Sequence, residues 1–191
     1  RDDQSALAKA LDWANSGWPD FAMYYPIMAA APEARIYGAQ VPRDVARAAF
    51  EDGIATAFSG DAGAYGLTDP LPDAQQSERE AMQMVAHCDA LPQEMLPGMV
   101  AIQRLRDAEL ARAVVQAMQD TGGPVVLITG NGHARKDWGA PSYLERAAPD
   151  LDVWVTGQSE ADAPLSGEYD EIRPAPAAER DDPCAAFKAN G

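Results

Sequence analysis

The stretch that decides the fold is Val125-Val126-Leu127-Ile128-Thr129-Gly130-Asn131-Gly132-His133. It begins with four consecutive apolar residues, three of them β-branched, and such a run is typical of a strand buried on both faces of a sheet. The two glycines that follow allow the backbone to turn tightly and to approach a ligand closely. Open α/β sheets bind ligands in loops at the carboxyl ends of their strands, so His133 is the first candidate for a functional residue.

The segments on either side of this stretch predict an α/β protein. Two further apolar segments, residues 35–41 and 151–156, are expected to form strands. Helices are expected at residues 4–15, near Pro26, and at residues 42–50, 77–86, 99–120 and 141–147. This order indicates a mostly parallel sheet flanked by helices, although three strands are few for a sheet covered on both faces.

The length of 191 residues is that of one domain. We expect an α/β domain over residues 1–157 and an acidic extension rich in proline and alanine over residues 158–191. The sequence begins at Arg1 with neither an initiator methionine nor a signal peptide. This beginning fits a processed or trimmed product better than a complete gene product.

The charge balance and the missing motifs exclude several classes of function. The chain has 15 basic and 30 acidic residues, a net charge of −15, so nucleic acid and anionic lipid should repel it. The motifs GxxxxGK[ST], HExxH and GxSxG are absent from the sequence. The pair Gly130-x-Gly132 lacks the third small residue of a dinucleotide-binding loop, because position 135 is arginine.

Histidine and cysteine are scarce in this chain. His87 and His133 are its only histidines, which excludes a zinc site built from several imidazoles. His133 could be a metal ligand beside carboxylates or a loop imidazole that caps a helix, and the helix dipole alone would explain His87 at a helix end. Cys88 and Cys184 could form a disulfide or remain two free thiols, and their spacing leaves both readings open.

Two further groups of residues are candidates with a structural alternative. Arg104, Arg106 and Asp107 lie together on the expected helix 99–120, where they could form a solvated face or bind carboxylates and phosphates. Tyr24 and Tyr25 lie in an aromatic segment that is more typical of a core or an interface. A phenolate beside an aromatic wall is also a plausible ligand for haem iron.

Several stretches together resemble one family, the ChaN-like haem-binding uptake proteins, which are bacterial, often lipid-anchored, and related to the Tiki and TraB group. The resemblance covers nearly the whole chain and implies an α/β fold, export across the inner membrane, and acquisition of iron or haem. It rests on Ser16-Gly17-Trp18-Pro19-Asp20-Phe21 with Tyr24, His87-Cys88-Asp89, residues 103–108, residues 130–135, Gly139-Ala140-Pro141-Ser142-Tyr143-Leu144 and Asp182-Pro183-Cys184.

The resemblance also carries expectations about what surrounds this chain. Gly130 to His133 matches the later of two Gly-x-x-His or Gly-x-x-Glu motifs of the wider superfamily, and nothing matches the earlier one. The resemblance therefore implies that the α/β domain lacks its N-terminal strands here. Because the family is exported, the resemblance favours pairing of Cys88 with Cys184.

The family binds haem through tyrosine, which makes Tyr24, Tyr25 and Tyr143 the candidate iron ligands, in that order. The resemblance implies that His133 and His87 lie near the haem or its propionates. It implies that Arg104, Arg106 or Arg135 binds the propionates, because a carboxylate that leaves water needs a charged donor. Asp107, Gly130 and Gly132 complete the expected haem site.

The sequence is therefore interpreted as a haem-binding protein of a bacterial envelope uptake system. We expect it in the periplasm or held at the membrane by a lipid anchor outside this chain, and a homodimer could enclose haem between its subunits. A binding protein is favoured over an enzyme. The alternative is a metal-dependent hydrolase of the Tiki type, in which His133 is a metal ligand or general base.

Overall fold

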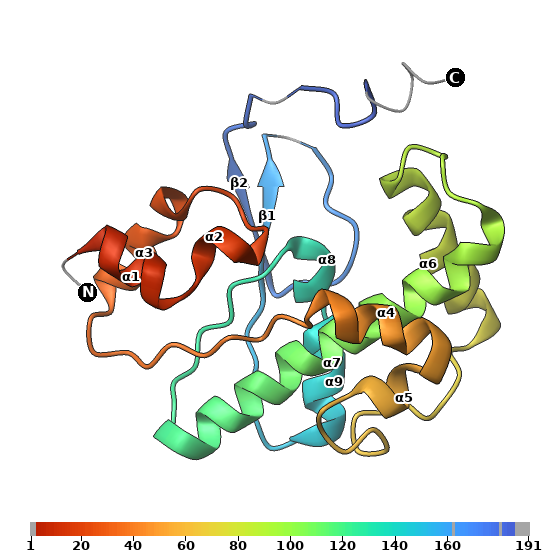
Figure 1. The fold of residues 1–191 in the computed structure, drawn as a ribbon, viewed down its shortest axis with the longest axis horizontal. Helices are drawn as coiled ribbons and strands as arrows, with labels where there is room; N and C mark the ends of the chain where they lie inside the picture. The colour runs from red at the N-terminus through yellow and green to blue at the C-terminus, as the bar shows by residue number, and fades with distance from the viewer. Residues whose placement is uncertain (1–2, 162, 180, 186–191) are drawn as a thin grey trace. The chain divides into compact units, whose positions relative to one another are not determined.

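The structure is a computed structural model that describes residues 3–161, 163–179 and 181–185. The chain divides into two units, Arg1–Tyr37 and Gly38–Gly191. Figure 1 shows that helices make up most of the regular structure, and a parallel pair of strands completes it. The expected α/β class is confirmed at this level.

The first unit consists of short helices. The expected helix over residues 4–15 is two helices, because Asp12 takes a left-handed backbone conformation (φ 49°) between them. Asp3 caps the first helix by accepting a hydrogen bond from the Ala6 amide at 3.0 Å. The elements are α1 (Gln4–Ala10), α2 (Trp13–Ser16), the 3₁₀ helix η1 (Phe21–Met23) and α3 (Tyr25–Ala30).

Aromatic rings hold the first unit together. The Trp13 ring lies 4.9 Å from that of Phe21 and 5.0 Å from that of Tyr24, measured between centroids. The Trp13 indole N–H donates to the carbonyl of Pro19 at 2.7 Å. Tilted ring pairs of this kind stabilise by about 0.5–1.5 kcal/mol beyond the area they bury. Tyr24 therefore has a packing role within this unit.

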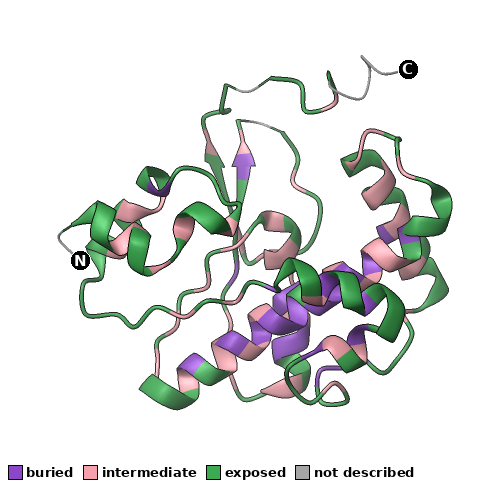
Figure 2. Cartoon of the chain, in the orientation of Figure 1, coloured by how far each residue is buried: buried purple, intermediate pink, exposed green. Residues whose placement is uncertain are grey.

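The second unit is built around α7 (Leu96–Thr121), which packs against α4, α5, α6 and α9. Figure 2 shows that the buried residues concentrate along α7 and α9. Val100, Leu105 and Ala108 of α7 are completely buried. The other helices are α4 (Arg43–Asp52), α5 (Ile54–Ala57), α6 (Asp73–Ala86), the 3₁₀ helix η2 (Gln93–Met95), α8 (Asn131–Ala134) and α9 (Ala140–Ala147).

The start of α6 differs from the expectation. A capping box at Ser77 predicted a start there, but the helix begins four residues earlier, at Asp73. Pro72 is the N-cap, and its φ of −56° leads directly into the first turn. The predicted start at Ser77 was therefore wrong, because Pro72 and the acidic residue Asp73 begin the helix further upstream.

The strands of the sheet are β1 (Thr156–Glu160) and β2 (Glu171–Ala175). They run parallel, with Thr156 opposite Glu171 and Glu160 opposite Ala175. The expected domain boundary between residues 157 and 158 falls inside β1, and β2 lies within the expected extension.

Residues 35–41 and 125–128, which were expected to form strands, are not strands in the structure. The expected strand at residues 151–156 is a strand only at Thr156, the first residue of β1, although the carbonyl of Val155 also accepts hydrogen bonds from the amides of Asp170 and Glu171.

Burial nevertheless alternates along residues 125–129: Val125 and Leu127 are half-buried, whereas Val126 is 81% exposed. The chain is thus extended but covered on one face only, which corrects the prediction of burial on both faces.

A disulfide joins Cys88 and Cys184 within the second unit, with their Cα atoms 5.5 Å apart. The pairing that the resemblance favoured is therefore present. Cys88 follows the last turn of α6, so the disulfide attaches the end of that helix to the C-terminal segment.

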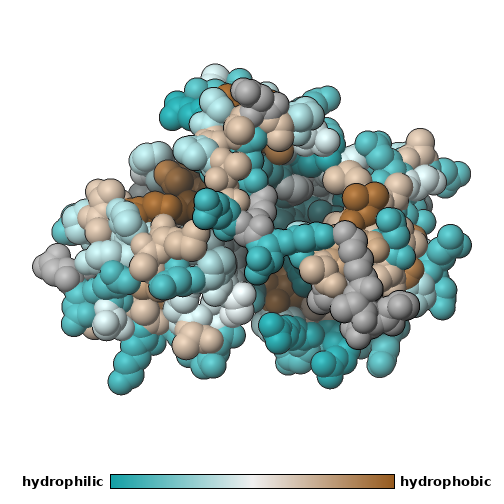
Figure 3. Space-filling model, turned by 90° about the horizontal axis from the view of Figure 1, so that it is seen from above, coloured by the Kyte–Doolittle hydropathy of each residue, from teal (hydrophilic) through white to brown (hydrophobic). Residues whose placement is uncertain are grey.

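The surface is mainly hydrophilic in the view of Figure 3, where apolar residues form small separate patches. Within the part of the chain that the structure describes, no helix combines the length and the apolar character needed to cross a membrane.

Candidate functional site

The second unit contains a cavity of about 470 Å³ between α4, α6, α7 and α8. This volume lies in the range of small-molecule binding sites, about 300–1,000 Å³. On both α4 and α7 the lining residues are spaced i, i+3, i+4 and i+7, which places them on one helix face. The lining residues are Arg43, Ala46, Arg47, Phe50, Gln83, His87, Met99, Ile102, Gln103, Arg106 and His133.

The lining combines an apolar wall with positive charge. Ala46, Phe50, Met99 and Ile102 supply the apolar side chains. Arg43, Arg47 and Arg106 supply the positive charge. Among the described residues, none of these three guanidinium groups has a hydrogen bond or an ion pair. Three unpaired cations at one cavity, in a chain of net charge −15, indicate a site for an anionic ligand with an apolar body.

His133 reaches the cavity from α8 and is held by a buried carboxylate. Its Nδ1 lies 2.6 Å from Oδ1 of Asp107, which projects from α7 and is completely buried. Within the described residues, Oδ2 of Asp107 has no hydrogen-bond partner. Burial raises the pKa of Asp107 to about 6, although the hydrogen bond from His133 and the charges of His133, Arg79 and Arg106 favour its ionised form.

His87 caps the C-terminus of α6, and its imidazole is fixed in a similar way. Its Nδ1 lies 2.8 Å from the backbone carbonyl of Gln83. A carbonyl only accepts, so this Nδ1 carries the proton and Nε2 keeps its lone pair. An ionised Asp107 imposes the same tautomer on His133. Both histidines thus have the arrangement typical of imidazoles that bind a metal through Nε2.

The loop around His133 is positioned by hydrogen bonds to β1. The side chain of Asn131 donates to the Gln158 carbonyl at 2.7 Å and accepts from the Gln158 amide at 3.1 Å. The expectation that the glycines of this loop make a special turn is wrong: Gly130 has φ −71° and Gly132 is helical. Neither requires the left-handed region that favours glycine.

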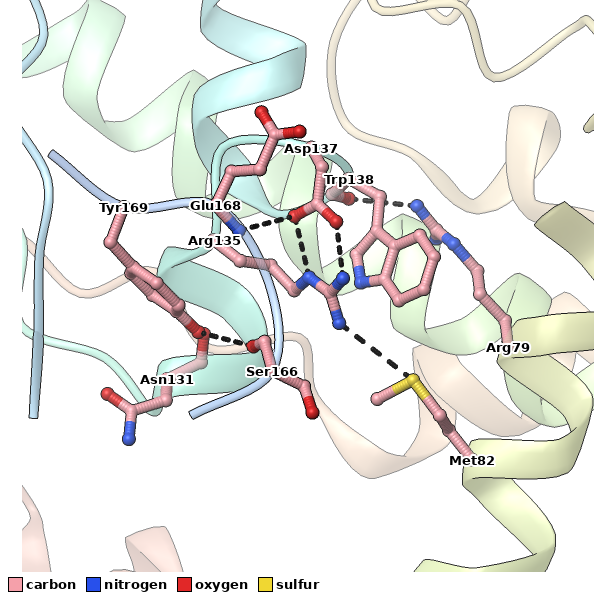
Figure 4. Close-up of polar contacts among 9 residues, drawn as sticks. All are labelled: Arg79, Met82, Asn131, Arg135, Asp137, Trp138, Ser166, Glu168 and Tyr169. Atoms are coloured by element: carbon pink, nitrogen blue, oxygen red, sulfur yellow. Dashed lines mark hydrogen bonds and ion pairs between the residues drawn. The ribbon is translucent and has the colours of Figure 1, made fainter. Parts of the chain in front are cut away.

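Two of the expected propionate-binding residues lie elsewhere. Figure 4 shows the Arg135 guanidinium enclosed by Asp137, Trp138 and Met82. It pairs with the Asp137 carboxylate, and its Cζ lies 3.5 Å from the Trp138 ring centroid. Arg104 donates to the carbonyls of Gly66 at 2.8 Å and Asp69 at 2.9 Å. Both guanidiniums are used within the fold, and neither lines the cavity.

Tyr143, the candidate tyrosine of the second unit, does not line the cavity either. Tyr143 is 6% exposed and belongs to the hydrophobic core, where burial raises its pKa. Tyr24 and Tyr25 belong to the first unit. Of the sequence-predicted residues, the structure brings His87, His133 and Arg106 together at the cavity, with Asp107 directly behind His133.

Sequence reasoning missed Arg43 and Arg47. Both are exposed residues of α4, and Ala46 and Phe50 share their helix face. The spacing of these four residues was visible in the sequence. That spacing alone does not indicate a functional face, because the cavity forms only where tertiary packing brings α6, α7 and α8 beside α4.

The buried carboxyl of Asp107 should make stability fall as pH rises. Below about pH 4 the group is protonated in both the folded and the unfolded state. Between pH 4 and 6 the folded protein keeps a proton that the unfolded chain releases, and a stabilisation of order 3 kcal/mol is lost through this window. Urea unfolding from pH 4 to 8 should show this fall, and Asp107→Asn should abolish it. The exposed Asp44→Asn is the control, and an unchanged pH profile in Asp107→Asn would contradict the assignment.

Comparison with known proteins identifies the family. The family model described as "Haem-binding uptake, Tiki superfamily, ChaN" matches residues 1–144. Comparisons with curated proteins and with solved structures gave no match. Because the matched residues make up well over half of the chain, the chain belongs to the ChaN family of haem-binding uptake proteins in the Tiki superfamily.

Proposed function

We propose that this protein binds haem in the cavity of its second unit. The observation that carries the proposal is the set of three unpaired arginines beside an apolar wall and two imidazoles. Haem is a flat apolar ring with two carboxylates and an iron atom, and each part has a matching group in the lining. The match to a haem-binding family supports the same ligand.

Eight of the lining residues have a role in this proposal. Phe50, Met99 and Ile102 would cover the ring, and Arg43, Arg47 and Arg106 would bind the propionates through charge-assisted hydrogen bonds. His87 and His133 would lie beside the iron, whose redox and ligand-binding chemistry the haem supplies.

Titration with haemin, followed by the Soret band, tests the proposal. Arg43→Ala combined with Arg47→Ala should weaken haemin binding by about thirtyfold to almost a thousandfold, because it removes two guanidinium–carboxylate contacts that each stabilise by about 1–2 kcal/mol. Arg173→Ala is the matched control, since Arg173 is exposed on β2 and pairs with Glu171. An affinity that is the same in the double variant and in the control would contradict the assignment of the propionates to α4.

The proposal extends to an uptake system in the bacterial envelope. The Cys88–Cys184 disulfide supports an oxidising compartment such as the periplasm. A lipid anchor outside this chain and a homodimer that encloses haem are further parts of the proposal. Labelling of cysteines in the protein isolated from its native compartment tests the first part, because free thiols there would oppose export.

Hydrolysis is a second candidate function, favoured by one observation. A carboxylate bonded to Nδ1 of a histidine is the arrangement that orients a general base, and Asp107 and His133 have it. In the described part of the chain, however, no three His, Cys, Asp or Glu residues are grouped to hold a metal ion. Equilibrium dialysis against Zn²⁺ and Mn²⁺ separates the two functions: tight metal binding without haemin binding would favour hydrolysis.

A further inference from the structure

The last two turns of α6 form one wall of the cavity, yet none of their residues is buried. Gln83 and His87 line the cavity from this part of the helix. Arg79 is the one buried residue of α6, and it lies a helical turn before Gln83. The Gln83 side chain is joined to α7 by a hydrogen bond from its Nε2 to Oε1 of Gln103 at 2.7 Å. A helix end with so little buried surface opens at a low cost in free energy.

Beyond His87 the backbone continues in a conformation that needs support. Cys88 has φ 60° and Asp89 has φ 56°, in the left-handed region that is unfavourable for residues with a Cβ atom. Residues in this conformation persist only where the surrounding structure holds them. The Asp89 amide donates to the carbonyl of Met84 at 3.0 Å, and the disulfide from Cys88 to Cys184 adds a covalent restraint. The disulfide thus fixes the helix end where burial does not.

The disulfide lies where its redox state can change. Both cysteines are half-buried, and the residues at positions 182, 183 and 185, which surround Cys184 in the sequence, are exposed. A disulfide oxidant or a dithiol can therefore reach the sulfur atoms. The bond joins α6 to a segment 96 residues away in the sequence, so opening it releases a long-range restraint on the cavity wall.

We propose that formation of the Cys88–Cys184 disulfide activates ligand binding at the cavity. This inference rests on the proposed haem-binding function and adds a regulation to it. In the oxidised chain the bond holds Gln83 and His87 at the wall, and in the dithiol form the end of α6 is loose for part of the time. A ligand that needs the ordered wall then binds more weakly, in proportion to the fraction of chains that lack it.

The activating step needs a disulfide oxidant, such as a thiol–disulfide oxidoreductase. The thiolate of one protein cysteine attacks the oxidant's disulfide and forms a mixed disulfide, and the other protein thiolate then displaces the oxidant. The oxidant leaves as a dithiol that carries two electrons and two protons, and the protein keeps one new S–S bond. Tight binding is thereby confined to an oxidising compartment. Because coupling is reciprocal, bound ligand should protect the disulfide by the same factor.

Haemin titration of the oxidised unaltered chain and of Cys88→Ser/Cys184→Ser tests the switch. The double variant imitates the dithiol form and leaves no thiolate that could ligate haem iron. We expect it to bind haemin about tenfold more weakly, within the usual range of coupling between sites. The amides of residues 83–87 should also exchange hydrogen faster in the double variant than in the unaltered chain.

Leu144→Ala is the control for general destabilisation. Leu144 is buried in the core and does not line the cavity, so its truncation lowers stability without releasing the end of α6. The Leu144→Ala protein should bind haemin as tightly as the unaltered chain does.

A second measurement uses the unaltered chain and needs no variant. Gallium(III) protoporphyrin keeps the ring and the propionates of haemin, and thiols do not reduce its metal. In a dithiothreitol redox buffer, a saturating concentration of this probe should shift the equilibrium toward the disulfide by the same factor of about ten. An equilibrium that the bound probe leaves unchanged would overturn the coupling.

The outcomes separate the switch from the proposed function. Equal haemin affinities of the unaltered chain and the double cysteine variant would leave haem binding in place and overturn the switch. An equal loss of affinity in Leu144→Ala would assign the effect to general destabilisation, which would also overturn it. If the oxidised unaltered chain binds no haemin, the proposed function fails and this inference fails with it.

Discussion

Replacing Gly139 with alanine should lower the free energy of unfolding by about 4 kcal/mol, at the upper end for a single substitution, and abolish haem binding. Gly139 has φ −80°, so the cause is lack of space rather than backbone strain. A Cβ there would lie 2.6 Å from the carbonyl oxygen of Arg135 and closer still to that of His133. The loop that carries His133 would have to move. Urea unfolding and haemin titration measure the two effects.

Gly132→Ala is the matched control for this prediction, because it adds the same methyl group to the same loop. The nearest atom to its added Cβ is Nε2 of Gln103 at 3.9 Å, an ordinary contact. Since Gly132 is helical, alanine should stabilise the protein by up to about 1 kcal/mol. A Gly139→Ala protein as stable as Gly132→Ala would show that the loop accommodates the methyl group easily.

Cys184→Ser should lower the free energy of unfolding by about 4–5 kcal/mol, because the disulfide closes a loop across a sequence separation of 96 residues. In the chain-entropy model this loss comes from the greater freedom of the unfolded chain. Because Cys88 is adjacent to His87, the end of α6 at the cavity should also become more mobile. Denaturant unfolding measures the first effect, and hydrogen exchange of the α6 amides measures the second.

A reducing agent provides the control for the disulfide. Dithiothreitol should destabilise the unaltered protein as much as Cys184→Ser does, and it should leave the double variant Cys88→Ser/Cys184→Ser unchanged. If dithiothreitol destabilises the double variant too, its effect does not arise from this bond. Equal stability of the unaltered protein with and without dithiothreitol would contradict a stabilising disulfide.

The longer helices of the second unit, α4, α6, α7 and α9, could be predicted because their signals are local. The short helices α5, η2 and α8 could not, and they lie in segments expected to be loops. The spacing of Ile102, Leu105 and Ala108 identified α7, and the glycine at position 122 ended it as expected. The start of α6 was misplaced because the sequence contains two start signals five residues apart, at Pro72 and at Ser77. Local patterns identify a helix more securely than they place its first residue.

The strands could not be predicted as reliably, because a strand depends on a partner that is distant in sequence. The run that includes Val126 and Ile128 has a strand-like composition, yet both residues are exposed and the segment pairs with no described neighbour. The segment that became β2 contains Pro174, which argues against a central strand. Its pairing with β1 was therefore not visible in the sequence.

The candidate site shows the same division between local and non-local information. His133, His87 and Arg106 were identified from residue type and motif context, and the structure places all three at one cavity. From the sequence, Arg104 was as plausible a ligand-binding residue as Arg106. Because the two residues are two positions apart on the helix, their side chains point in different directions, and that of Arg104 bonds to the carbonyl of Gly66. Which side of α7 faces a cavity is decided by the helices packed around it.

The most direct test of haem binding at this cavity compares haemin with its dimethyl ester on the unaltered chain. The ester keeps the ring and the iron but has no propionate charge for Arg43, Arg47 and Arg106 to bind. We predict that haemin binds saturably and that the ester binds about tenfold or more weakly than haemin. A tenfold difference is the effect of losing one charge-assisted contact. Absence of saturable haemin binding, or equal affinities for the two compounds, would contradict haem binding at this cavity.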